Sequence, residues 1–358
     1  FVTGATGFLG HHLCVQLVEA GHEVHALVRD PGSLAAQRLP DAVKLVTGNI
    51  LDADGLPDVV QAAGAKWFFH CAGWADKLDH VGLGAAPQPH GVAAQIIPWN
   101  FPLLMLAWKV APALAAGNTV VLKPAETTPL TAMLFAEICE QAGLPAGVVN
   151  LLTGAGDTGA ALVRHPDVDK VAFTGSTAVG REIAKAIAGT DKKLTLELGG
   201  KGANIVFDDA PLDQAIEGIV NGIFFNQGQV CCAGSRLLVQ ENVHDAVLER
   251  LKERMATLRL GDPLDKNTDV GAINSAEQLE RITRLVDRGE AEGGERWSPA
   301  CEIPAQGYWF PPTVVTGVDP AYLATLKEAA QPALEEWKEK MGDDADSILA
   351  AFEELRAE

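Results

Sequence analysis

The chain has 358 residues, of which 47% are hydrophobic and 21% charged, so it is long enough for two or three compact domains. Lys and Arg total 28 against 47 Asp and Glu, and the resulting net charge of −19 argues against a nucleic-acid or anionic membrane partner. The six cysteines include no CxxC pair, which favours free thiols and a cytoplasmic location. The most apolar stretch, residues 91–108, is interrupted by polar residues and prolines, so we expect it to be buried core and not a membrane helix.

Residues 1–70 alternate between strand-like and helix-like patterns, which predicts a βαβ series in a parallel sheet. The expected strands and helices, in chain order, are strand 1–3, helix 8–19, strands 23–28 and 43–47, helix 54–63 and strand 66–70. The chain begins inside the first of these patterns and without Met, as a fragment would.

After a Gly- and Pro-rich connector at residues 82–91, the alternation resumes and continues to about residue 320. The expected elements are strands 119–122, 148–152 and 170–173 and helices 131–142 and 180–188. The acidic segment 321–358 spaces its apolar residues helically, which predicts two helices broken near Gly342. We therefore expect an α/β fold in four segments, with boundaries 1–70, 71–205, 206–320 and 321–358.

A glycine-rich turn opens the chain: TGATGFLG places Gly4, Gly7 and Gly10 between a predicted strand and a predicted helix. The first glycine permits a tight turn, the second lets a pyrophosphate approach the backbone, and the third lets the helix pack on the strand. This pattern predicts a dinucleotide site, and the alternative is a turn without a ligand. It resembles the opening of the extended short-chain dehydrogenase/reductase family, the epimerases and dehydratases. Arg29, after the second strand, favours a 2′-phosphate if a cofactor binds here.

The chemistry of that family requires a Tyr-x-x-x-Lys pair, in which the lysine lowers the pKa of the tyrosine. The chain has two tyrosines, Tyr308 and Tyr322, and neither is followed by lysine at that spacing. The resemblance therefore implies at most cofactor binding by residues 1–70.

A second group of residues carries the stronger chemical signal. Cys231 and Cys232 follow a helix end in a Gly-containing turn, where backbone N–H groups can stabilise a thiolate. Glu197 lies at a strand end before two glycines and can bring a carboxylate to a cavity, although a solvated strand end is the alternative. Asn100 stands between two prolines, so its amide can be held rigidly as an oxyanion donor.

Two further segments follow strands at the edge where cofactors bind in open α/β sheets. Lys123 and Glu126 come directly after one buried strand. FTGSTAVG places Gly175, Ser176 and Gly180 at a helix N-terminus, which can receive a phosphate. The nine histidines lack metal-ligand spacing, so we expect no metal site.

From about residue 72 to residue 320, these segments resemble the aldehyde dehydrogenase superfamily. The resemblance implies that Cys231 is the nucleophile, that Glu197 is the general base, and that Asn100 with the Cys231 N–H forms the oxyanion hole. It also implies a cofactor site, with ribose on Lys123 and Glu126, pyrophosphate at Gly175, Ser176 and Gly180, and nicotinamide beside Trp99 and Leu198. The cofactor is expected to be NAD, with NADP possible, and the substrate a small-molecule aldehyde that is oxidised to a carboxylic acid through a cysteine thiohemiacetal.

The chain departs from that family after Pro320. The family continues with a Glu-Glu-Ile-Phe-Gly-Pro segment whose glutamate holds the nicotinamide ribose, whereas this chain has AYLATL at residues 321–326. The oligomerisation segment is also missing, so a homo-oligomer is left open, and we expect aldehyde turnover to be impaired. Residues 322–358 resemble the C-terminal helices of tripartite-transporter solute-binding proteins.

The expected architecture is thus parallel-sheet Rossmann-like units, comprising a reductase-type βαβ fragment, an incomplete aldehyde dehydrogenase fold and a helical C-terminal tail. Two alternative functions are a dinucleotide-binding protein like the nucleotide-sugar epimerases and reductases, and a soluble α/β protein without catalysis.

Overall fold

The computed structural model describes residues 57–81, 84 and 86–317, with short pieces at 2–3, 25–28, 37, 40–42, 44–47, 335, 338–339 and 342. It divides into two compact units. Unit 1 comprises Phe1–Gly202 and Gln229–Ala233, and unit 2 comprises Ala203–Gly228 and Gly234–Glu358. Several sequence predictions lie outside the described residues: Gly4, Gly7, Gly10, Arg29, the helix at 8–19 and nearly all of the tail at 321–358.

The described strands of residues 1–70 form a parallel sheet of their own in the order β1-β2-β3. These strands are β1 (Val2–Thr3), β2 (His25–Val28) and β3 (Lys44–Thr47), and all three fall where strands were predicted.

Unit 1 is built on a second parallel sheet of five strands, in the order β6-β5-β4-β7-β8. The strands are β4 (Val92–Ile96), β5 (Thr119–Lys123), β6 (Val149–Leu151), β7 (Lys170–Gly175) and β8 (Lys193–Leu198). β5 and β6 are added in succession on one side of β4, and β7 and β8 are added on its other side. The direction reverses between β4 and β7, and ligands bind at such switch points in open α/β sheets.

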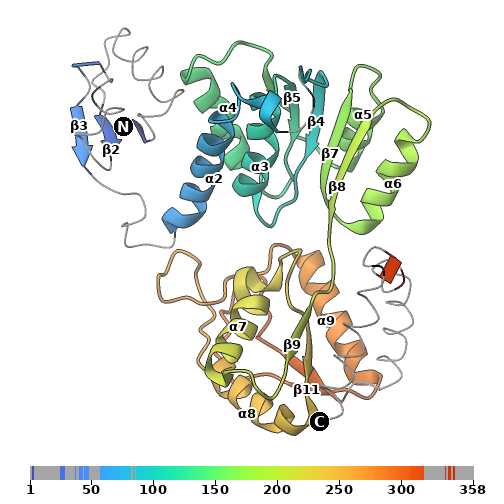
Figure 1. Ribbon diagram of the computed structural model, residues 1–358. Helices are drawn as coiled ribbons and strands as arrows, with labels where there is room; N and C mark the ends of the chain where they lie inside the picture. The colour runs from blue at the N-terminus through green and yellow to red at the C-terminus, as the bar shows by residue number, and fades with distance from the viewer. Residues whose placement is uncertain are drawn as a thin grey trace. The chain divides into compact units, whose positions relative to one another are not determined.

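Helices cover both faces of this sheet (Figure 1). On one face lie α3 (Pro102–Ala115) and α4 (Leu130–Gln141), and on the other lie α5 (Gly156–Arg164) and α6 (Thr177–Ile187). Leu106 of α3 packs with Val120 and Leu122 in the first core, and Ile183 of α6 packs with Val171 in the second. β5, β6 and β7 fall where strands were predicted. β5 and β7 are largely apolar runs, as is typical of strands that are covered on both faces.

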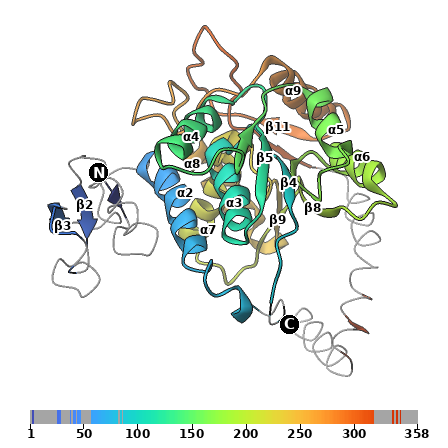
Figure 2. The same cartoon turned by 90° about the horizontal axis from the view of Figure 1, so that it is seen from above.

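Residues 57–72 correct one prediction, because they form the single helix α2 (Pro57–Ala72) and not a short helix followed by a strand at residues 66–70. The run of aromatic residues in this segment favours a strand. In the structure Phe68 stacks on Phe135 of α4 with ring centroids 5.3 Å apart, and Cys71 is buried. α2 lies beside α3 (Figure 2), and this packing outweighs the strand propensity of the aromatic residues. The expected boundary at residue 70 falls within this helix, which is followed by the 3-10 turn η1 (Leu78–His80).

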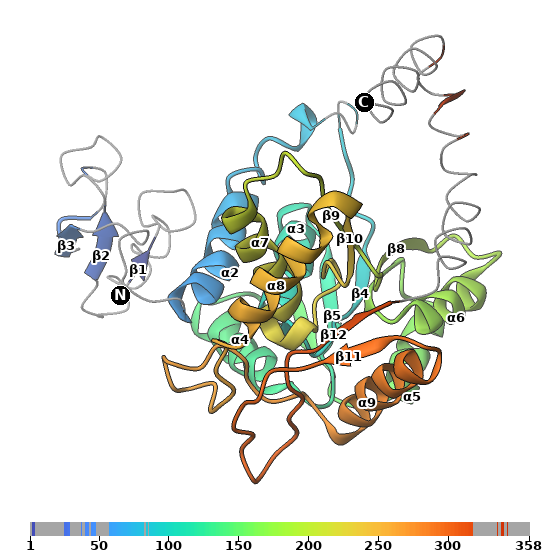
Figure 3. The ribbon, with the colours of Figure 1, turned by 90° about the horizontal axis from the view of Figure 1, so that it is seen from below.

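Unit 2 packs α7 (Leu212–Phe224) and α8 (His244–Met255) with the parallel strands β9 (Ala203–Val206) and β10 (Arg236–Val239) (Figure 3). Val247 and Met255 of α8 are fully buried in its core. On the surface, Arg254 of α8 donates from Nε to Glu217 of α7 at 2.6 Å. The remaining elements are α9 (Ala276–Ala291), the antiparallel pair β11 (Glu295–Trp297) and β12 (Val314–Thr316), and the turns η2 (Phe225–Gly228) and η3 (Glu241–Val243).

None of the helices in the described part of the chain combines the length and apolar character that a membrane crossing requires.

We expect Leu106→Ala to destabilise unit 1 by about 2–5 kcal/mol, because the fully buried side chain leaves a cavity between α3 and the sheet. Leu134→Ala is the matched control, since Leu134 of α4 is 56% exposed and its truncation should change stability by less than about 0.5 kcal/mol. Urea unfolding of the two variants measures the difference. Equal losses of unfolding free energy in the two variants would contradict the described packing of α3.

Candidate functional site

Three segments that are distant in the sequence meet in unit 1. Asn100, in the loop between β4 and α3, donates from Nδ2 to the carbonyl oxygen of Gln229 at 2.8 Å. The turn after β8 runs along the same segment, because a Cβ atom on Gly202 would lie 3.1 Å from the carbonyl oxygen of Ala233. The structure therefore holds the predicted thiol segment between the ends of β4 and β8.

The two thiols of this segment, Cys231 and Cys232, are both exposed. The pKa of Cys231 is raised above its ordinary value, first by partial burial of the sulfur and then by the charge of Cys232 and the hydrogen bond with its side chain. The raised pKa favours the thiol form of Cys231 over the thiolate. A nucleophilic role requires a base that removes its proton.

The backbone immediately before this segment is strained. Asn226 and Gln227 have positive φ angles of 48° and 56°, which residues other than glycine rarely adopt. Gly228 follows with φ of 73°, and a Cβ atom there would lie 2.8 Å from the carbonyl oxygen of Ile223, so only glycine fits. Backbone strain of this kind, of order 1–3 kcal/mol per residue, is typical of functional turns.

Glu197 is the penultimate residue of β8, is exposed, and pairs in register with Thr174 of β7. Lys109 of α3 is half-buried on the same face of the sheet, and burial lowers its pKa to about 8. The Glu197 carboxylate acts on Lys109 in the opposite direction and raises the pKa, while Lys170 lowers it further. The sequence analysis missed Lys109. Its one signal was a lysine directly after the apolar stretch that ends at Trp108.

On the cofactor side, Lys123 ends β5 with only 3% of its surface exposed. Its ammonium donates to the carbonyl oxygen of Pro124 at 3.0 Å and lies 3.8 Å from a carboxylate oxygen of Glu126. Glu126 itself is exposed. The predicted pair is thus present, with the cation inside and the anion at the surface.

The start of α6 lies at the end of β7. Ser176 is the N-cap, and its Oγ accepts from the backbone N–H of Val179 at 3.3 Å. Gly175 is the last residue of β7, and a Cβ atom on Gly180 would lie 2.5 Å from Cδ2 of Leu198. The glycine therefore lets the first turn of α6 pack closely on the end of β8. Trp99 is half-buried in the loop after β4.

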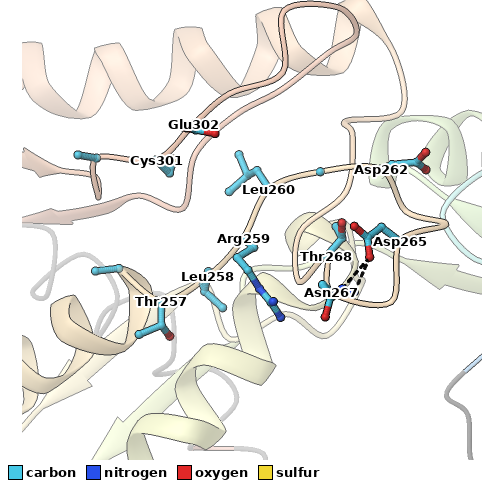
Figure 4. A pocket seen from close by; sticks show the side chains of 13 residues that line it. Thr257, Leu258, Arg259, Leu260, Asp262, Asp265, Asn267, Thr268, Cys301 and Glu302 are labelled. Carbon is cyan, nitrogen blue, oxygen red and sulfur yellow. Dashed lines mark hydrogen bonds between the residues drawn. The ribbon is translucent and has the colours of Figure 1, made fainter.

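Unit 2 contains a separate cavity of about 440 Å³, which no motif predicted (Figure 4). Its lining is polar: Asp265 accepts from the backbone and side-chain nitrogens of Asn267 at 2.9 Å and 3.1 Å, and Arg259 and Glu302 lie nearby. Within the described residues, no group of three or more His, Cys, Asp and Glu side chains is arranged to hold a metal ion.

Comparison with known families gives two matches. The model of the aldehyde dehydrogenase family matches residues 55–347, and the model of the NAD dependent epimerase/dehydratase family matches residues 1–82. The first match begins before residue 72 and continues past residue 320, so it is longer than the motifs alone indicated.

Similar curated proteins include the aldehyde dehydrogenase of Emericella nidulans, which is 45% identical over 82% of this chain and 62% of its own length. Retinal dehydrogenase 2 of Homo sapiens is 43% identical over 78% of this chain and 56% of its own length. The chain spans 54–62% of the length of the curated relatives that it matches.

Among solved structures, the NAD-dependent aldehyde dehydrogenase from Sinorhizobium meliloti aligns with a TM-score of 0.69 at 40% identity, covering 74% of this chain and 55% of that one. The NAD+ complex of aldehyde dehydrogenase from Bacillus cereus aligns with a TM-score of 0.68 at 41% identity, covering 72% and 54%. The family match covers most of the chain and includes the Asn100, Glu197 and Cys231 segments of unit 1. The chain belongs to the aldehyde dehydrogenase family.

Proposed function

We propose that this chain oxidises an aldehyde to a carboxylic acid at the unit 1 site, with NAD as the hydride acceptor. The observation that carries the proposal is the contact between Asn100 and Gln229, which holds the thiol segment beside the end of β4. Similar proteins support it, since several are described as aldehyde dehydrogenases and four of the similar solved structures are complexes with NAD.

In the first step, the Cys231 sulfur attacks the carbonyl carbon of the aldehyde and the thiol proton passes to Glu197. The carbonyl π electrons move onto the oxygen. The Asn100 amide and the Cys231 backbone N–H donate to that oxyanion, and loss of one such donor costs about 10²–10³ in rate. The hydrogen bond to Gln229 keeps the Asn100 amide oriented.

Bound NAD would supply the hydride acceptor for the hemithioacetal carbon. A thioester on Cys231 remains. Glu197 passes the thiol proton to solvent and, as a carboxylate again, removes a proton from water. The water oxygen attacks the thioester carbon, and the carbon–sulfur bond breaks to release the acid and the Cys231 thiolate, which takes back a proton from Glu197. A carboxylate in this position favours hydrolysis over transfer to coenzyme A.

The residues present fit the polar groups of a dinucleotide. Lys123 has three N–H donors, and its one hydrogen bond within the described residues goes to Pro124. Thr174 Oγ, at the end of β7, is buried and finds no partner among the described residues. We assign Lys123 and Glu126 to the adenosine ribose, and the Glu126 carboxylate favours the 2′-hydroxyl of NAD over the 2′-phosphate of NADP by repulsion.

The phosphates and the nicotinamide have their own partners in this proposal. Gly175, Ser176 and Gly180 form the helix start that receives the pyrophosphate. Trp99 and Leu198 line the nicotinamide side, at the carboxyl ends of β4 and β8. We also propose that the protein works in the cytoplasm, because its cysteines show no CxxC spacing.

A second candidate function rests on the match of residues 1–82 to the epimerase/dehydratase family. That segment carries Gly4, Gly7 and Gly10 but no Tyr-x-x-x-Lys pair, so the candidate function is dinucleotide binding.

We expect Lys123→Ala to weaken NAD binding about 10–100-fold, because a buried charged hydrogen-bond donor is worth about 1.5–3 kcal/mol. Lys185→Ala is the matched control, since Lys185 is 74% exposed on α6 and carries the same charge. Isothermal titration calorimetry with NAD measures the dissociation constants of both variants. Retained binding in Lys123→Ala together with lost binding in Gly7→Val would favour the second candidate.

We expect the 358-residue chain to hydrolyse an activated ester but to oxidise aldehyde slowly, because the ester reaction needs no hydride transfer. Residues 321–326 lack the ribose-anchoring glutamate of the family, and misplacement of the nicotinamide by about 1 Å costs ~10² in rate. Assays with p-nitrophenyl acetate and with aldehyde plus NAD test this, with Cys231→Ser expected to abolish both reactions. Aldehyde turnover near ~10 s⁻¹ would contradict the expected impairment.

We expect Cys232→Ala to lower the pKa of Cys231, because the substitution removes the neighbouring charge and side-chain hydrogen bond that raise it, while the effect of burial stays. Alkylation of Cys231 by iodoacetamide at pH 7 should then become severalfold faster. Peptide mapping by mass spectrometry over a pH series measures the rate at which Cys231 is alkylated, with Cys301→Ala as the control. An unchanged Cys231 rate would show that burial alone sets its reactivity.

A further inference from the structure

The face of the unit 1 sheet beneath α3 carries a line of polar residues. The Gln95 side chain donates from Nε2 to the carbonyl oxygen of Lys109 at 2.8 Å, so this part of α3 lies over β4. Gln95 is in register with Ala172 of β7. Since side chains alternate along a strand, Lys170 and Thr174 share the face of Ala172, one on each side of it.

β8 continues the same line. Thr195 is in register with Ala172, and Glu197 is in register with Thr174. Lys109 therefore has Glu197 toward the carboxyl ends of the strands and Lys170 toward the amino ends. The Lys170 ammonium donates to Thr195 Oγ1 at 2.8 Å, which fixes its charge on this face.

We propose that Lys170 is a positioning residue of the thiol site: held by Thr195, its ammonium repels the charge of Lys109 and biases Lys109 toward the neutral form that can take a proton from Glu197. This inference rests on the proposed function, in which Glu197 is the general base. Lys170 touches neither substrate nor cofactor in it. The chemistry is Coulombic: a like charge disfavours the protonated ammonium, and partial burial weakens solvent screening.

The other elements around α3 place no further charge at this position among the described residues. α2 contributes Lys66 and His70, both exposed, and α4 contributes Glu137 and Glu140, also exposed. β4 offers the neutral Gln95 amide. Lys123 of β5 is in register with Ile96, which packs in the core on the opposite face.

The pKa values agree with this geometry. Burial lowers the pKa of Lys109 to about 8, and Glu197 and Lys170 are the two charges that act on it, in opposite directions. Burial also lowers the pKa of Lys170. Removal of the Lys170 charge should therefore raise the pKa of Lys109, because its protonated form loses a repulsive neighbour.

The test is a titration of Lys109 after reductive ¹³C-methylation of the whole chain, followed by NMR, with the Lys109 resonance identified by its loss in Lys109→Arg. The midpoint in the unmodified sequence is expected at about 8. Lys170→Met should raise it by at least about 0.5 pH units, and Lys170→Arg, which keeps the charge, should leave it in place. Thr195→Val, which releases the Lys170 ammonium without removing it, should give a smaller rise.

Lys193→Gln is the matched control, because Lys193 is exposed on the same face, pairs in register with Lys170 and is not among the charges that act on Lys109. An unchanged midpoint in Lys170→Met would overturn the proposal, and so would an equal rise in Lys193→Gln. The titration needs neither aldehyde nor NAD, so failure of the proposed function would appear separately, as lost NAD binding and lost ester hydrolysis. The pH profile of ester hydrolysis gives a second readout, whose midpoint should rise in Lys170→Met.

Discussion

The hydrogen bond from Asn100 to the carbonyl oxygen of Gln229 joins residues 129 positions apart, and the unit 1 site depends on it. The thiol segment that carries Cys231 and Cys232 connects residues of unit 2 on both sides of it. With this hydrogen bond, the thiol segment lies beside the end of β4, and the close approach of Gly202 to Ala233 holds the same segment beside the turn after β8. The hydrogen bond orients the Asn100 amide, and the missing side chain of Gly202 lets the two backbone segments approach closely.

This arrangement follows from the strand order. The order of strands in the sheet reverses between β4 and β7, and ligands bind at the carboxyl ends of the strands at such switch points in open α/β sheets. Except for Cys231, the residues that the proposal assigns to the unit 1 site lie at the carboxyl ends of β4, β5, β7 and β8 or in the segments that follow them. Lys109 of α3 lies over the same sheet, and its burial lowers its pKa.

The chain spans 54–62% of the length of the curated relatives that it matches, and residues 1–82 match the model of a second family. The described strands of that first segment form their own sheet and do not extend the five-stranded sheet of unit 1. The outer face of α4 leaves Leu130, Leu134 and Ile138 more than half exposed. At this helical spacing the three side chains form one exposed apolar face of α4.

The sequence by itself determined the alternating α/β pattern, because strands buried on both faces and helices with one apolar face have local periods that can be counted. It also indicated the segments around Asn100, Glu197, Cys231 and Lys123 as candidates for the site. Each of these residues lies beside a glycine, a proline or a strand end, which are local features of the sequence. The sequence alone did not predict the helix at residues 57–72. This segment is helical because it packs against α3 and α4, where Phe68 stacks on Phe135. Only the tertiary structure decided that Lys109 faces Glu197 and Lys170, because burial and charge at that position come from strands more than 60 residues away in the sequence.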